Sequence, residues 1–292
     1  AIDTVREVTN VKKINTLGFC IGGTLLTCAA GVIAKQKKDT INSITLMASL
    51  LEFSDPGILK IFIDEASISI REGAIGQKGV MAGSELASTF SFLRPDDLIW
   101  NYYVSNYLKG EKPVPFDLLY WNGDGANLPG PFYCWYLKNF YLEDQLKKPN
   151  NLSICGQKID LQAITCPIYA MGAKEDHIVP CKSAFTSASL FGGKIRFVLG
   201  ASGHITGCIN AASKNKRSYW ISSDYDTISG IKFSDWSKST SEVKGSWWID
   251  WNIWLSENNG KLIRRQKKYG DKNHRVIEKA PGRYVREVAR KF

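Results

Sequence analysis

The chain has 292 residues, of which 44% are hydrophobic and 23% charged, as in ordinary globular proteins of one or two domains. Its formal net charge is +10, but residues 261–292 hold twelve lysines and arginines against three acidic residues, so the other 260 residues are almost neutral. The charge therefore belongs to a basic tail, and it does not predict a nucleic-acid-binding domain.

Seven cysteines are spread along the chain, and no two of them form a Cys-x-x-Cys pair. Their odd number and wide spacing favour reduced thiols in a cytoplasmic protein over a disulfide framework. The chain has only three histidines, and they do not cluster with cysteines. We therefore expect no metal site.

The first elements predict a parallel α/β sheet. Apolar residues at helical spacing indicate a short helix within residues 1–10. Buried strands are expected at 14–17 and 44–48, with a helix over residues 24–34 between them. The order strand, helix, strand is typical of α/β folds.

A candidate nucleophile lies between the first strand and its helix. Gly18, Cys20 and Gly22 have the spacing of a nucleophile elbow, with cysteine in place of the usual serine. The tight turn of an elbow favours residues without a Cβ, and Gly18, Gly22 and Gly23 supply them. Two structural alternatives stay open at this point: a membrane helix over the uncharged run 14–34, and a buried structural thiol at Cys20.

Residues 51–150 predict an inserted subdomain. The alternation of strands and helices stops there, and the segment is too long for a loop between two sheet strands. Fifteen of the chain's 34 aromatic residues lie between Phe90 and Tyr141. We interpret most of them as a packed core, with an apolar tunnel or a dimer face as the alternative.

The sheet pattern resumes after the insertion. Strands are expected at 166–172 and 194–199, and a later helix is expected over residues 246–255. Polar loops that contain Asp176 and His204 follow the two strands. Such loops lie at the carboxyl ends of the strands, where open α/β sheets bind their ligands.

Cys20, Asp176 and His204 together predict a nucleophile, an acid and a base. Each follows a predicted strand, and their chain order is that of α/β-hydrolases. We expect His204 to activate the Cys20 thiol and Asp176 to orient His204. His177 is the rival base, but as the neighbour of Asp176 it is better placed to pack beside the site. The backbone amide of Ile21 is the expected oxyanion donor.

Seven longer motifs are dispersed over nearly the whole chain, at residues 18–24, 90–95, 113–122, 127–131, 175–180, 199–204 and 280–285. On these motifs the chain resembles the class I polyhydroxyalkanoate synthases. The resemblance implies an α/β-hydrolase core with a cap, and it matches Cys20, Asp176 and His204 to the family's catalytic residues. We accordingly divide the chain into core residues 1–50 and 151–260, a cap at 51–150 and the basic tail at 261–292.

The resemblance also implies an activity and a setting. The activity is an acyltransferase that polymerises (R)-3-hydroxyacyl-CoA into a polyester and releases CoA, through a thioester on Cys20. Coenzyme A is then part of the substrate, and no cofactor is expected. The setting is a cytoplasmic homodimer, formed through the cap at the surface of polyester granules, with no nucleic acid and no transmembrane segment.

Some features depart from the family pattern. Gly125, Ala126, Cys181 and Cys208 stand where other residues are usual, but none belongs to the triad. The family's N-terminal domain and first sheet strands are expected upstream, together with a second oxyanion donor, so the activity of this chain alone stays open. Two other functions also stay open: a thioesterase or esterase of the same fold, and a non-catalytic binding protein of the granule surface.

Overall fold

The computed structural model describes residues 1–113, 115, 120–121, 123–224, 227–264 and 269–289. The chain is divided into two units. Unit 1 comprises Ala1–Lys60 and Asn139–Val276, and unit 2 comprises Ile61–Lys138 and Ile277–Phe292. Unit 2 therefore contains most of the insertion that the sequence predicts at 51–150, with narrower bounds, and the basic tail is divided between the two units.

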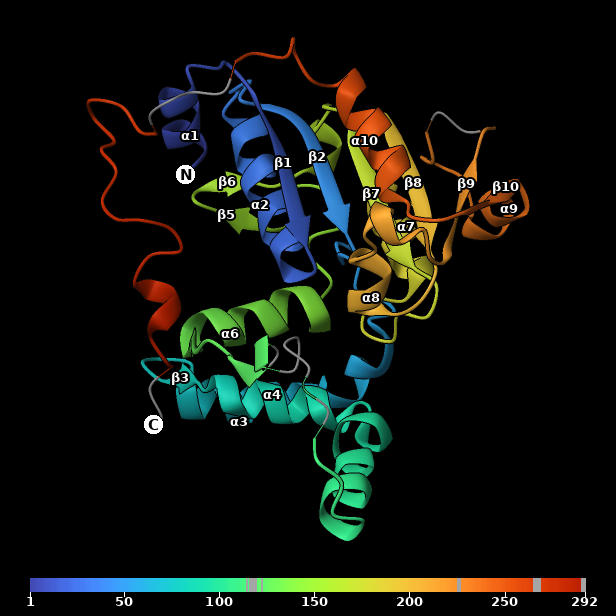
Figure 1. Ribbon diagram of the computed structural model, residues 1–292. Coiled ribbons are helices and arrows are strands. Elements are labelled where there is room, and N and C mark those ends of the chain that lie inside the picture. The colour runs from blue at the N-terminus through green and yellow to red at the C-terminus, as the bar shows by residue number, and fades with distance from the viewer. Residues whose placement is uncertain (114, 116–119, 122, 225–226, 265–268, 290–292) are drawn as a thin grey trace. The chain divides into compact units, whose positions relative to one another are not determined.

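Unit 1 is built on a six-stranded sheet in the order β1-β2-β7-β8-β9-β10 (Figure 1). The first four strands run parallel, and the last two are antiparallel. The strands are β1 (Ile14–Phe19), β2 (Ile41–Met47), β7 (Ile168–Ala173), β8 (Ile195–Gly200), β9 (Ser218–Ser222) and β10 (Thr240–Lys244). The four parallel strands include all those predicted from the sequence, whereas β9 and β10 were not predicted.

The centre of the sheet is buried on both faces. Ile44, Ile168 and Ile195 are paired across three neighbouring strands, and none of them is exposed to solvent. Parallel strands covered on both sides are apolar almost without interruption, which is why these strands could be recognised as apolar runs. The predicted α/β sheet is confirmed.

Helices cover both faces of this sheet. The main ones are α1 (Ile2–Thr9), α2 (Ile21–Lys35), α7 (Cys181–Ala188), α8 (His204–Cys208), α9 (Phe233–Lys238) and α10 (Trp248–Glu257). On one face, α2 approaches Leu46 and α7 approaches Gly172. On the other face, side chains of α10 bond to Thr45 and Tyr169, because successive strand residues point to opposite sides.

The remaining elements are distributed over both units. In unit 1 they are β5 (Ser153–Ile154), β6 (Gln157–Lys158) and short helical turns at Leu161–Ala163 and Ala212–Lys214. The turn Gly57–Phe62 crosses the boundary between the units. In unit 2 they are α3 (Glu65–Ile75), β3 (Val80–Met81), α4 (Gly83–Phe92), two π-helical turns (Asp96–Trp100 and Tyr103–Leu108), β4 (Leu128–Pro129), α6 (Gly130–Tyr136) and a 3-10 turn (Tyr284–Arg286). A further π-helical turn, Leu137–Leu142, follows α6. Helices α3 and α6 pack together within unit 2.

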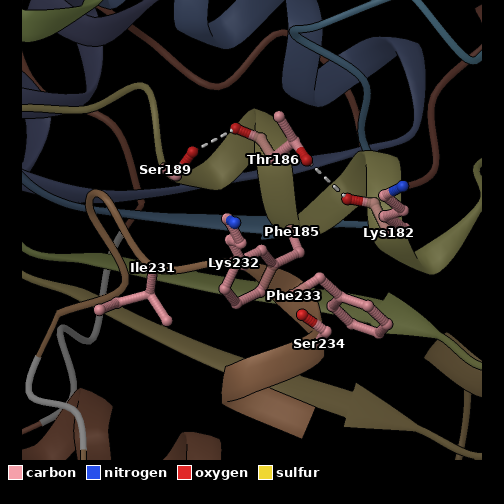
Figure 2. A pocket seen from close by; sticks show the side chains of 8 residues that line it. All are labelled: Lys182, Phe185, Thr186, Ser189, Ile231, Lys232, Phe233 and Ser234. Atoms are coloured by element: carbon pink, nitrogen blue, oxygen red, sulfur yellow. Dashed lines mark hydrogen bonds between the residues drawn. The ribbon is translucent and has the colours of Figure 1, made fainter.

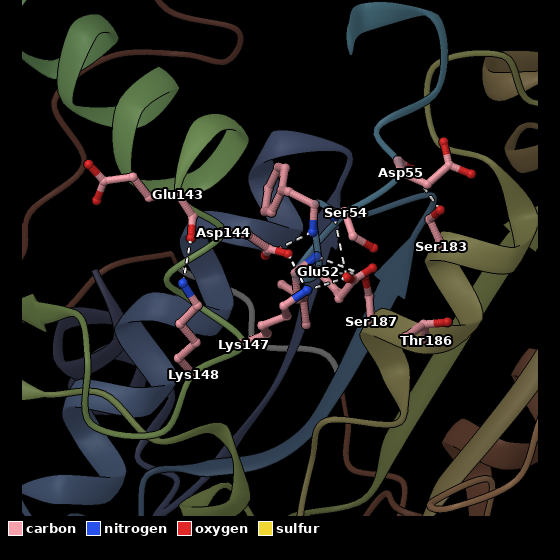
Figure 3. Close-up of polar contacts among 12 residues, drawn as sticks. Glu52, Ser54, Asp55, Glu143, Asp144, Lys147, Lys148, Ser183, Thr186 and Ser187 are labelled. Atoms are coloured by element: carbon pink, nitrogen blue, oxygen red, sulfur yellow. Dashed lines mark hydrogen bonds and ion pairs between the residues drawn. The ribbon is translucent and has the colours of Figure 1, made fainter. Parts of the chain in front are cut away.

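Both ends of the insertion are anchored in unit 1 by a polar network (Figure 3). Lys147 Nζ lies 2.7 Å from Glu52 Oε1 and 2.5 Å from Asp144 Oδ2. Asp144 Oδ1 accepts the amide of Phe53 at 2.9 Å. Burial favours the neutral form of Glu52, but hydrogen bonds to Lys147 and Ser54 and the charge of Lys147 outweigh burial and lower the pKa of Glu52. These contacts join Glu52 and Phe53 to Asp144 and Lys147, and all four residues belong to unit 1.

The uncharged run 14–34 forms strand β1, a turn and most of helix α2. Within the described part of the chain, no helix has the length and apolar character needed to cross a membrane. The absence of charge in this run is explained by packing, because α2 lies against the sheet and has buried residues on both its first and its middle turns.

Candidate active site

Cys20 stands at the turn between β1 and α2, in a strained backbone conformation. Its φ of 54° and ψ of −126° lie outside the regions that residues other than glycine usually adopt. The amide of Cys20 donates to Met47 O on the neighbouring strand at 2.9 Å, and the carbonyl of Cys20 accepts the amide of Gly23 at 2.9 Å. Strain of this kind persists only where the surrounding structure holds it, and it is concentrated at functional sites.

The glycines around Cys20 differ in what they contribute. A Cβ on Gly18 would lie 2.4 Å from the Cα of Gly23, and a Cβ on Gly23 would lie 2.0 Å from Ser49 Oγ. Gly18 and Gly23 are therefore required by close packing, as predicted. The prediction was wrong for Gly22, because a Cβ there would have no neighbour within 4 Å.

Asp176 and His204 form a buried pair beside the elbow. His204 Nδ1 lies 2.6 Å from Asp176 Oδ2, and the Asp176 side chain is fully buried. The other carboxylate oxygen accepts the amides of Ile178 at 2.9 Å and Val179 at 2.8 Å. These amides fix the carboxylate in the loop after β7, so that it can hold the ring of His204, which begins α8 after β8.

The ring of His204 is also in contact with the elbow. It stacks on Phe19 at 5.2 Å between ring centroids. Burial, the largest influence, lowers the pKa of His204, but hydrogen bonds to Asp176 and Cys20 and the charges of both outweigh it. Together they raise the pKa to about 9. The structure thus brings Cys20, Asp176 and His204 together around one imidazole ring.

The other sequence-predicted residues lie nearby in the chain. His177 is half-buried in the loop after β7, but the histidine that bonds to the Asp176 carboxylate is His204. Ile21 is the first residue of α2, and the first amides of a helix lack partners within the helix. That position suits the expected oxyanion role of Ile21, which stays a prediction. The sequence reasoning did not anticipate Phe19, although its place directly before the nucleophile was a signal.

Several other thiols are held in the protonated form. Burial raises the pKa of Cys28 to about 12 and that of Cys166 to about 11. Burial also raises the pKa of Cys208, by a larger amount. Such thiols are poor nucleophiles near neutral pH. Cys20, by contrast with Cys28 and Cys208, is only partly buried.

A pocket of about 510 Å³ lies elsewhere in unit 1, between α7 and the start of α9 (Figure 2). It is lined by Lys182, Phe185, Thr186, Ser189, Ile231, Lys232, Phe233 and Ser234. Cys20, Asp176 and His204 do not line this pocket.

The contact of Asp176 with His204 is expected to make stability depend on pH. The folded pKa of His204, about 9, lies above the ordinary value of 6.5, so the stabilisation is complete below pH 6.5 and is lost as pH rises through 9. The free energy of unfolding, measured in urea between pH 6 and 10, should fall more steeply for the wild type than for Asp176→Asn. Asp271→Asn, which removes a contact with His274 between side chains that are each about 30% exposed, is the control and should leave the wild-type slope unchanged. Equal slopes for all three proteins would contradict the prediction.

Comparisons with known proteins agree with the fold and with the family resemblance described above. A family model described as alpha/beta hydrolase fold matches residues 1–208. The chain is 48% identical over 99% of its length to the poly(3-hydroxyalkanoate) polymerase subunit PhaC of Cupriavidus necator, and covers 49% of that protein. It is 39% identical to the PhaC subunit of Rhizobium meliloti, with 98% of this chain and 46% of the relative covered. For the PhaC subunit of Rhizobium etli the identity is 38%, with 98% and 44% covered.

The chain thus spans about half the length of the curated relatives that it matches. The match extends over almost all of the chain, so unit 1 and unit 2 both fall within it. The resemblance to polyhydroxyalkanoate synthases, first seen in the dispersed motifs, is confirmed by these relatives.

Proposed function

The chain belongs to the alpha/beta hydrolase fold family, and from this premise we propose that it carries the catalytic triad of a polyhydroxyalkanoate polymerase. One observation carries the proposal: His204 Nδ1 lies 2.6 Å from Asp176 Oδ2, and the ring of His204 stacks on Phe19, the residue directly before Cys20 on the strained elbow. The polymerase named among the relatives supports the choice of substrate, an (R)-3-hydroxyacyl-CoA.

The first half of the reaction is acyl transfer to the thiol. His204 takes the proton of Cys20, and the sulfur attacks the thioester carbonyl of the hydroxyacyl-CoA. The amide of Ile21 stabilises the negative oxygen of the tetrahedral intermediate. The carbon–sulfur bond to CoA then breaks, and the imidazolium returns its proton to the leaving CoA thiolate. The product is a thioester on Cys20, as activated as the substrate.

The second half forms the polyester bond. The 3-hydroxyl of another hydroxyacyl unit loses its proton to His204 and attacks the acyl group on Cys20. An ester bond forms, the bond to Cys20 breaks, and its sulfur recovers the proton from the imidazolium. Asp176 is engaged by His204 and by two backbone amides, which favours His204 rather than Asp176 as the base in this step.

The setting is part of the same proposal. Coenzyme A enters with the substrate and leaves as product, so we propose no cofactor. We further propose a cytoplasmic homodimer at the surface of polyester granules. The exposed aromatic residues of unit 2, which include Trp100 and Tyr107, support an association surface there.

Product analysis tests the proposal on the full-length protein that contains this chain. With (R)-3-hydroxybutyryl-CoA as substrate, released CoA should be matched by insoluble polyester and by little free acid. A thioesterase of the same fold would release CoA and free 3-hydroxy acid in equal amounts, without polymer. That result would overturn the proposal, as would the absence of any CoA release.

A further inference from the structure

Helix α8, which begins with His204, has its last carbonyl groups bound by side chains from a distant part of the chain. With five residues it is too short to be stable by itself, and the last carbonyls of any helix lack partners within it. Trp247 Nε1 donates to the carbonyl of Gly207 at 2.9 Å, and Trp248 Nε1 donates to that of Cys208 at 2.9 Å. Two neighbouring indoles thus bind two neighbouring carbonyls.

Ser246 adds a third contact of the same kind. Its hydroxyl donates to the carbonyl of Asn210 and accepts the amide of Trp248 at 3.1 Å. Ser246 and Trp247 are almost completely buried, at 0% and 1% exposure, so water cannot replace these donors. Residues 246–248 therefore form a clasp on the chain segment that follows His204.

The clasp is itself fixed to the strand that leads to the acid. The ring of Trp247 stacks on Tyr169 of β7, with centroids 6.0 Å apart. Asp250, three residues further along, accepts the hydroxyl of Tyr169 at 2.9 Å and Nε of Arg196 at 3.0 Å. Strand β7 runs into the loop that holds Asp176. The clasp thus connects the element that carries the base to the element that carries the acid.

We propose that Trp247 and Trp248 are positioning residues for His204, because their indole N–H groups hold α8 where its first side chain meets Asp176 and Cys20. The inference rests on the proposed function only for its kinetic test. A displacement of the base by about 1 Å is enough to lower a rate by one to two orders of magnitude. Packing of the rings alone does not require donors aimed at these two carbonyls.

The test replaces each indole by a ring without a donor, in the full-length protein. Trp247→Phe and Trp248→Phe should each lower kcat about tenfold, with KM unchanged. Trp251→Phe is the matched control, because Trp251 lies on the same helix but donates to Thr45 Oγ1 at 3.0 Å, away from α8. Its kcat should stay within about twofold of the wild type.

A second readout does not depend on polymerase activity. The three histidines of the chain can be titrated by nuclear magnetic resonance, and the pKa of His204, about 9, depends on the bonds to Asp176 and Cys20. It should be lower in the two clasp variants and unchanged in Trp251→Phe. If polymer formation fails in every protein, this titration still decides the inference, so the two failures are distinguishable.

Two results would overturn the positioning role. One is a loss of thermal stability in all three variants with the same pKa for His204 as in the wild type. The other is an equal fall in kcat for Trp251→Phe. Should Trp247→Phe fail to fold because its ring is buried, Trp248→Phe carries the test, since the Trp248 side chain lies partly at the surface.

Discussion

Replacing Cys20 by alanine should abolish acyl transfer and leave the fold intact. Alanine keeps the Cβ and meets the same backbone strain as cysteine, but it removes the only atom of the elbow that can form the thioester. We expect CoA release and polymer yield to fall by at least about a thousandfold in the full-length protein. Circular dichroism and thermal unfolding should match the wild type, so the loss can be assigned to chemistry.

Cys155→Ala is the matched control, because Cys155 is an exposed thiol in the turn between β5 and β6. This variant should keep full activity, and it also removes a competing site for thiol reagents. In that background, rapid alkylation by iodoacetamide at neutral pH should occur at Cys20, and His204→Gln should slow it. Unimpaired polymer formation by Cys20→Ala would refute the triad, and uniformly slow alkylation would favour a non-catalytic binding protein.

Gly18→Ala should destabilise the protein severely, whereas Gly22→Ala should not. The new Cβ at Gly18 would lie 2.4 Å from the Cα and 2.6 Å from the amide nitrogen of Gly23, and these backbone atoms cannot move without rebuilding the elbow. We expect a loss of about 3 kcal/mol in the free energy of unfolding, or a failure to fold. Activity should fall with it, because the same turn orients Cys20.

Gly22→Ala is the control two residues beyond the nucleophile, where a Cβ meets nothing within 4 Å. Because Gly22 lies in the first turn of α2, alanine there should be neutral or should stabilise by up to about 1 kcal/mol. Chemical denaturation of both variants measures the difference. If both alanines lowered the free energy of unfolding equally, the close approach of Gly18 to Gly23 would not be the cause of the destabilisation.

The sequence allowed the parallel strands to be predicted, and it placed Cys20, Asp176 and His204 at the ends of strands, where the structure brings Asp176 and His204 into contact. Apolar runs marked β1, β2, β7 and β8, and the spacing around Cys20 marked the elbow. Strands β9 and β10 were missed because they are only partly buried, so neither has the apolar run that marks a central strand. Their pairing depends on contacts distant in sequence.

The two units have bounds that differ from those of the cap predicted at 51–150. Leu51, Phe53, Phe140 and Leu146 are all buried in unit 1, although a reading of alternating strands and helices places them in the cap. For Trp247 and Trp248, at the start of α10, the sequence likewise predicts only part of what the structure shows. Their sequence indicates core packing, which Trp247 confirms at 1% exposure, but it does not reveal which carbonyls their N–H groups bind.

The polar network around Lys147 joins the two ends of the insertion. Phe53 and Asp144 are 91 positions apart in the sequence but are bonded at 2.9 Å, so the chain leaves unit 1 and returns to it at neighbouring points. The entropy cost of closing a loop grows only with the logarithm of its length. As far as loop closure is concerned, a change in the length of the segment Ile61–Lys138 therefore costs the rest of the fold little. Cys20, Asp176 and His204 all lie in unit 1, outside this segment.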